Sequence, residues 1–192
     1  MKTKFPIWRS VVIENKPDLN GINISFYVND MIEKIPYPVK RQKIDLVKVT
    51  VGELGFTKGY STTSEIYTKA HELGLALCPP QVGLQLREDY REQSQEEWIS
   101  IGMEPITDSR VGPRVFGLRR GGDRLWLYGP WAGPDSWWYL DSEFVFVSTS
   151  KNLKSKTLGT PQLLNTLESL AMERRIQELE EKVKKLLNVI KV

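Results

Sequence analysis

The chain has 192 residues, of which 40% are hydrophobic and 27% are charged, and its formal net charge is +3. This composition is typical of a globular protein and excludes a disordered or low-complexity chain, and the apolar runs are too short to span a bilayer. The single cysteine, Cys78, excludes an intramolecular disulfide, so we expect a reducing, cytoplasmic setting.

The N-terminal segment predicts two strands on either side of a helix. Its apolar stretch is too short and too interrupted for a secretory signal, so we interpret residues 7–13 as a first strand. Residues 24–35 place apolar side chains at helical intervals, which predicts an amphipathic helix that ends before Pro36. Residues 44–51 alternate apolar with polar side chains, which predicts a half-buried second strand.

A second helix is predicted over residues 64–74. Ser61, Thr62 or Thr63 can serve as its N-cap, and Glu65 follows early in the first turn, where a carboxylate is stabilising. Gly74 is a typical residue just beyond a helix end.

The middle of the chain predicts consecutive strands linked by short polar turns. Aromatic and β-branched runs alternate there with Gly, Pro and Asp, a pattern typical of an antiparallel meander. The five predicted strands are residues 84–90, 98–103, 115–118, 125–128 and 144–147. We therefore predict an α+β domain over residues 1–148, with a mainly antiparallel sheet of about five strands and two packed helices.

The C-terminal part of the chain has a different composition. Residues 149–161 are rich in Ser, Thr and Lys and lack periodicity, which predicts a linker. Residues 162–192 predict an amphipathic, coiled-coil-like helix, with β-branched residues at the a positions and mainly Leu at the d positions. That pattern favours a parallel homodimer, although such a helix could also pack on its own domain. The residues of the predicted seam are Met172, Ile176, Leu179, Val183, Leu186 and Ile190.

The segment from residue 131 to residue 139 is the best candidate for a binding surface. Trp and Tyr next to Gly, Pro and Asp supply large, rigid contact areas with a polar group, and a protein, a peptide or a sugar would suit that chemistry. Trp126 alternates with its strand and is expected in the core, whereas Trp137 and Trp138 are adjacent and should point to opposite faces. The candidate binding residues are Trp131, Trp137, Trp138 and Tyr139.

An enzymatic alternative rests on the only histidine and the only cysteine. His71 and Cys78 could form an activated thiolate, with carboxylates at the predicted turns as acid–base groups, which would make the protein a small hydrolase. Their spacing matches no nucleophile motif, and one His with one Cys cannot build a structural zinc site, so we expect no metal and no cofactor. The turn carboxylates are Glu104, Asp108, Asp123, Asp135, Asp141 and Glu143.

Nucleic-acid binding is disfavoured by the charge distribution. Arginines dominate residues 109–125, but acidic residues dominate the nearby segment 84–104, and no single extended basic face is predicted. Arg119, Arg120 and Arg124 surround a Gly-Gly-Asp turn, where a solvated turn is the simpler interpretation.

About half of the chain resembles a family of uncharacterised bacterial proteins. The resemblance covers roughly residues 53–147 and is carried by ELGF (53–56), EIYTKAHELGLALCPPQVGLQLR (65–87), MEPITDS (103–109), RVFGLRR (114–120), LWL (125–127) and the closing FVFV, with IWRSVVI near the start also similar. It implies no activity, cofactor or catalytic residue. The segment after Ser148 departs from the family pattern, as expected of an added oligomerisation tail.

These observations favour a non-enzymatic, cytoplasmic interaction module. It would self-associate through residues 162–192 and present the segment 131–139 to a protein or peptide partner.

Overall fold

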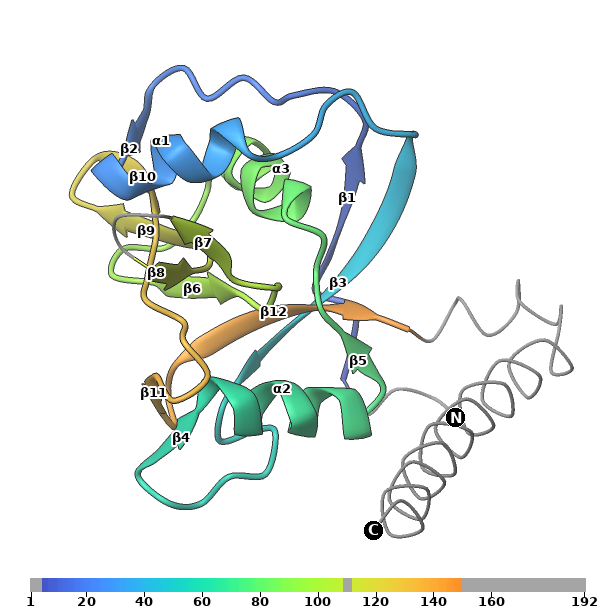
Figure 1. Ribbon diagram of the computed structural model, residues 1–192, viewed down its shortest axis with the longest axis vertical. Helices are drawn as coiled ribbons and strands as arrows, with labels where there is room; N and C mark the ends of the chain where they lie inside the picture. Colours follow the sequence, from blue (N-terminus) through green and yellow to red (C-terminus); the bar gives the residue numbers. More distant parts are fainter. Residues whose placement is uncertain (1–4, 109–111, 150–192) are drawn as a thin grey trace, which may run out of the picture. The chain divides into compact units, whose positions relative to one another are not determined.

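One large mixed sheet dominates the computed structural model, which describes residues 5–108 and 112–149. Among these residues, eight strands form the sheet, which curves into a half-barrel (Figure 1). Seven strands follow one another in the spatial order β1 (Arg9–Ile13), β3 (Gln42–Thr50), β12 (Glu143–Ser148), β6 (Trp98–Ile101), β9 (Gly117–Gly121), β10 (Arg124–Tyr128) and β2 (Ile22–Ile24). The eighth, β5 (Leu75–Ala76), pairs with the end of β12. Most neighbours are antiparallel, but β12 with β6 and β10 with β2 are parallel.

Two short ribbons and three helices complete the part of the chain that the structure describes. The ribbons pair β4 (Tyr60–Thr62) with β11 (Trp137–Tyr139), and β7 (Ile106–Asp108) with β8 (Gly112–Arg114). The helices are α1 (Phe26–Glu33), α2 (Thr63–Glu72) and α3 (Gln81–Asp89). Within these described ranges, no helix has both the length and the apolar character needed to cross a membrane.

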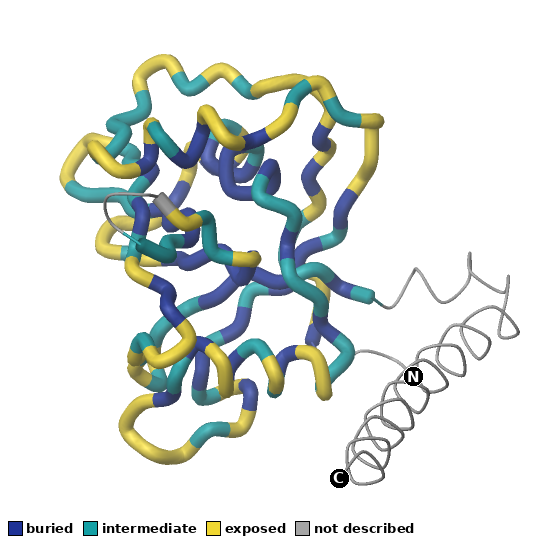
Figure 2. The backbone as a smooth tube through the Cα atoms, viewed as in Figure 1, coloured by how far each residue is buried: buried dark blue, intermediate teal, exposed yellow. Residues whose placement is uncertain are grey.

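The core consists of two apolar clusters, because the central strands bury side chains on both faces of the sheet. On β3, Leu46 belongs to one cluster and the next residue, Val47, to the other, and on β12 Val145 and Phe146 divide in the same way. Residues of α1 and α3 complete the first cluster, and α2 contributes Ile66 and Ala70 to the second. In Figure 2 the buried backbone follows this pattern, with helices above and below the central strands.

The two predicted helices are present, and the second begins at one of the three expected caps. Thr62 is the N-cap of α2, and its side chain accepts a hydrogen bond from the backbone N–H of Glu65. The Glu65 carboxylate accepts one in return from the backbone N–H of Thr62, at 2.8 Å, which completes a capping box.

The predicted α+β class with a five-stranded, mainly antiparallel meander is wrong. The protein is mostly β, and its largest sheet has eight strands, mixed directions and a non-sequential order. The first strand pairs with residues 42–46 and the last one, β12, is inserted between β3 and β6. The polar turns identified in the sequence do separate strands, but they do not determine which strands become neighbours.

Residues 84–89 form part of helix α3, with Tyr90 as its C-cap, and not the predicted strand. The helix begins directly after Pro79 and Pro80, and Leu84 and Leu86 are both fully buried. Val82, Gly83 and Arg87 are buried as well, so the helix is buried around most of its circumference. A helix that is buried on most sides shows no clear 3.6-residue period, and the Leu-Gln-Leu spacing then imitates a strand.

The contacts of the chain separate a unit of residues Met1–Ser150 from a unit of residues Lys151–Val192. The predicted linker, the predicted helix 162–192 and its seam residues lie outside the described residues. Self-association through residues 162–192 therefore stays a prediction.

Candidate functional site

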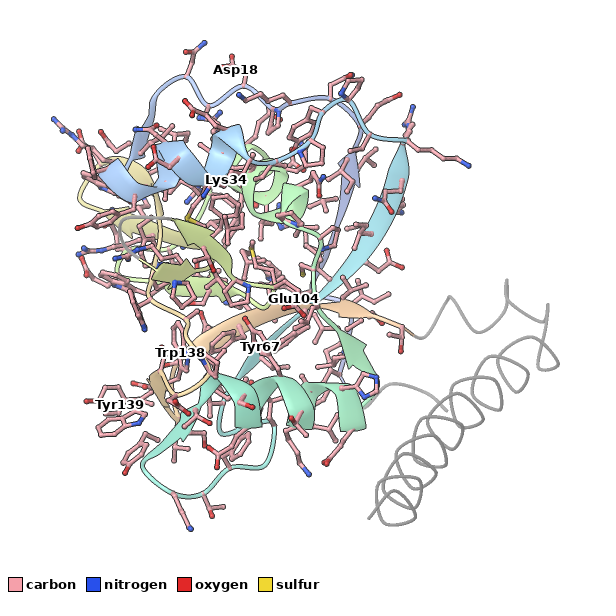
Figure 3. All side chains as sticks on the ribbon, in the orientation of Figure 1. Asp18, Lys34, Tyr67, Glu104, Trp138 and Tyr139 are labelled. Carbon is pink, nitrogen blue, oxygen red and sulfur yellow. The ribbon has the colours of Figure 1, made fainter. Side chains whose placement is uncertain are left out.

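The ribbon of β4 and β11 carries a patch of exposed aromatic rings. Trp137 is paired with Thr62 and Tyr139 with Tyr60, so these side chains share one face of the ribbon. The rings of Tyr60 and Trp137 stack, with centroids 4.8 Å apart and planes inclined by 23°. Figure 3 shows Tyr139 projecting outward from β11.

Trp138 points to the opposite face of the ribbon and is partly buried. Its indole N–H donates to Thr63 Oγ1 at 2.8 Å, and its ring packs edge-on against Phe144 with centroids 4.7 Å apart. The ring contacts both core clusters. Trp138 is therefore an anchor for the ribbon.

Trp131 is exposed, but its ring packs against Gly112 and lies near Arg114. A Cβ on Gly112 would lie only 2.5 Å from the Trp131 ring, so the glycine allows the indole to lie directly on the backbone. The Arg114 guanidinium lies 5.7 Å from the centroid of that ring and 4.1 Å from the centroid of Tyr27, and it donates to the carbonyl of Gly129.

The backbone between these rings is tied to helix α2. The N–H groups of Thr63 and Ser64, at the start of α2, donate to the carbonyls of Ser136 and Pro134 at 3.0 and 3.1 Å. The first N–H groups of a helix have no partner within it, so the segment supplies acceptors that the helix needs. The Ser136 N–H donates in turn to the Gly133 carbonyl at 3.0 Å. This loop is consequently anchored at several points.

We call Tyr60, Trp131, Trp137 and Tyr139 the aromatic surface. Between 51% and 72% of each residue is exposed: Trp131 51%, Tyr60 52%, Trp137 70% and Tyr139 72%. An open groove of about 570 Å³ lies along it, lined by Pro113, Trp131, Gly133, Pro134, Asp135, Ser136 and Trp137. Three of the four predicted binding residues thus belong to one exposed surface, and the fourth, Trp138, supports it.

Sequence reasoning missed Tyr60. It lies 77 positions before Trp137 in the numbering, and only the pairing of β4 with β11 brings the two rings together. A lone tyrosine after Lys58-Gly59 carries no signal that could have identified this neighbour.

Trp126, which we predicted in the core, lies on the outer face of strand β10, opposite the buried Leu127. Leu127 is the fully buried residue of β10 and faces Leu118 of β9, whereas Trp126 is half-buried and belongs to neither core cluster. Alternation along a strand shows which residues share a face, but not which face is turned inward. Beside Trp126 on that outer face, Arg119 lies 4.0 Å from the ring centroid of Trp98.

The structure does not support the predicted His71 and Cys78 pair. Cys78 is buried, its thiol lies 3.5 Å from the Val145 carbonyl, and burial raises its pKa well above the usual range, so the thiolate is disfavoured. His71 is exposed in the last turn of α2. Because the nucleophile of a cysteine hydrolase is a thiolate, this environment disfavours the hydrolase alternative.

Most of the turn carboxylates whose side chains the structure describes lie at the surface. Glu104, Asp123, Asp135 and Asp141 are exposed, and Glu143 forms an ion pair with Lys48 at 3.1 Å. The side chain of Asp108 lies outside the described residues. Within the described part of the chain, no group of three or more His, Cys, Asp or Glu side chains could hold a metal ion.

Comparisons of the chain with protein-family models, with curated proteins and with solved structures find no match.

Proposed function

We propose that this protein is an interaction module whose aromatic surface docks a protein or peptide partner. The observation that carries this proposal is the exposure of four large rings on one anchored surface. Single exposed apolar residues are normal, but a connected patch of large rings beside a groove is typical of a binding site. Trp and Tyr are also the residues that contribute most to binding energy in interfaces.

The stacking and hydrogen bonds that hold this surface in place support the same function. Trp137 stacks on Tyr60, and the loop between Trp131 and Trp137 is hydrogen-bonded to α2. Rings that are already ordered lose little conformational entropy when a partner binds, which favours affinity.

We further propose that the full chain acts in the cytoplasm as a parallel homodimer joined through residues 162–192. Two copies of the aromatic surface in one particle would raise the apparent affinity for a partner that carries repeated motifs. The heptad pattern of that segment and the single, buried Cys78 support this part of the proposal.

Affinity capture with the full chain tests the proposed function. Wild-type protein and the variants Trp137→Ala and Tyr139→Ala would be used as baits, and captured proteins would be identified by mass spectrometry. We expect both substitutions to remove a specific set of partners, because each deletes an exposed ring. Trp98→Ala is the matched control, since Trp98 is also an exposed tryptophan but lies on β6, outside the aromatic surface.

Identical partner sets for wild type and Trp137→Ala would show that the aromatic surface does not dock proteins. Loss of the same partners in Trp98→Ala would place the binding surface elsewhere on the sheet.

A further inference from the structure

The groove beside the aromatic surface has a lining whose chemistry restricts its ligand. Trp131, Trp137, Pro113 and Pro134 supply ring surfaces, and Gly133 leaves space between them. Asp135 is the one charged residue of this lining, and it is exposed. The groove therefore suits an apolar, ring-bearing ligand with a positive charge at one side.

The two indoles at the groove also offer hydrogen-bond donors. Trp138 donates its N–H to Thr63 Oγ1, whereas Trp131 and Trp137 are exposed, and within residues 5–108 and 112–149 their indole N–H groups form no hydrogen bond with the protein. An indole N–H can only donate, so a ligand carbonyl is its natural partner. The ligand should therefore present carbonyl groups that its own structure leaves free.

An extended proline-rich peptide that also carries a Lys or Arg meets all three requirements. A polyproline II segment has no internal hydrogen bonds, so its carbonyls are free, and its rings are already ordered before binding. Such segments bind in aromatic-lined grooves. We propose that the groove binds a proline-rich segment of a partner protein, with proline rings on Trp131 and Trp137 and a ligand Lys or Arg beside Asp135.

A sugar ligand fits the same rings less well. Sugar hydroxyls lose hydrogen bonds to water when they are buried, and the protein must replace them. The groove lining has only two polar side chains, Asp135 and Ser136, and the Ser136 hydroxyl oxygen is buried without a partner in the described structure. Proline rings need no such replacement, so the lining favours the peptide.

This inference rests on the proposed function, because it names the ligand class of the same surface. Its test uses the full chain and a fluorescein-labelled decaproline peptide that carries one arginine. Binding is measured by fluorescence polarisation and by the change in intrinsic tryptophan fluorescence. The comparison peptides are decaproline without arginine and an arginine-bearing peptide in which alanines replace the prolines.

We expect the arginine-bearing decaproline to bind and the alanine peptide not to bind. Trp137→Ala should weaken binding by at least about tenfold, as for a central aromatic contact. Trp137→Phe, which keeps a ring but removes the N–H, should weaken it less. Asp135→Asn should weaken the arginine-bearing peptide by about threefold, as for an exposed ion pair, and leave the neutral decaproline unchanged. Trp98→Ala should bind like wild type, and circular dichroism verifies the fold of each variant.

Equal affinity for the proline and alanine peptides, or unchanged binding by Trp137→Ala, would overturn the inference. So would binding of cellohexaose that quenches tryptophan fluorescence in wild type but not in Trp137→Ala, since the ligand would then be a sugar. If affinity capture depends on Trp137 but no proline peptide binds, the ligand class is wrong while the proposed function stands. If neither depends on Trp137, both are wrong.

Discussion

Trp137 and Trp138 are neighbours in the chain but have opposite surroundings. On β11 successive side chains point to opposite faces, so Trp137 is 70% exposed, whereas the ring of Trp138 packs against Phe144 and donates a hydrogen bond to Thr63. One residue presents its ring at the surface, and the next one holds the strand that presents it. Substitutions at the two positions should therefore affect different properties.

Replacing Trp138 with alanine should destabilise the fold far more than replacing Trp137. Trp138→Ala removes a partly buried ring and a hydrogen bond, so we expect the free energy of unfolding to fall by about 2–4 kcal/mol. Trp137→Ala removes an exposed ring and its stacking on Tyr60, so the loss should stay below about 1 kcal/mol. Urea denaturation followed by circular dichroism measures both. Similar losses in the two variants would contradict the distinction between anchor and contact residue.

At the scale of elements, the fold depends on close contact where β6, β12 and residue 78 meet. The Gly102 N–H donates to the Val145 carbonyl at 2.9 Å, and the Gly102 carbonyl accepts from the Cys78 N–H at 2.7 Å. A Cβ on Gly102 would lie 2.2 Å from the ring of Phe146, which is fully buried. The junction thus requires a residue without a side chain.

Gly102→Ala should destabilise the protein by roughly 1–3 kcal/mol, because the Phe146 ring must move within a packed core. Gly59→Ala is the matched control, since an added Cβ there meets no atom within 4 Å. Thermal or urea unfolding should show a clear loss for the first variant and a change within about 0.5 kcal/mol for the second. A Gly102→Ala variant as stable as wild type would show that the ring of Phe146 can move at little cost.

At the scale of the whole molecule, several groups with raised pKa values link stability to alkaline pH. Burial raises the pKa of Tyr37 and Tyr128 to about 12, and burial together with Glu97 does so for Tyr90. Burial also raises the pKa of the Cys78 thiol and of the Tyr67 phenol. All of these groups are held in their neutral forms by the fold.

The free energy of unfolding should therefore fall as the pH rises. In the unfolded chain, cysteine and tyrosine lose their protons near pH values of about 8.5 and 10, whereas the folded chain retains them to higher pH. The unfolded state then binds fewer protons, so stability is fully present below about pH 8 and decreases progressively above it. Urea midpoints measured at neutral pH and at several alkaline values test this trend. A midpoint that stays constant up to about pH 11 would contradict it.

The assembly of the full chain is a separate prediction at the same scale. Light scattering should give a dimer for the full chain and a monomer for a chain that ends at Ser148. Leu179→Asp with Leu186→Asp in the full chain should also give a monomer, because a charge at a d position opposes the seam. Equal masses per chain in all three cases would contradict the coiled coil.

The sequence by itself determined the features that depend on neighbouring residues. Apolar spacing predicted helices over residues 24–35 and 64–74, which the structure places at residues 26–33 and 63–72, and the cap candidates Ser61, Thr62 and Thr63 before Glu65 located the start of the second one. Alternation showed that Trp137 and Trp138 face opposite ways. Each of these signals is local, because caps, helical faces and strand faces are set by residues a few positions apart.

Only the tertiary structure decided the sheet order, the helix at residues 81–89 and the composition of the aromatic surface. The insertion of β12 between β3 and β6 and the stacking of Tyr60 on Trp137 join residues far apart in the chain. Burial on most sides removed the period of α3, and the side of β10 that faces inward was set by the elements that cover it. Local patterns carry no information about such long-range packing, so they could identify the rings but not the surface that the rings form.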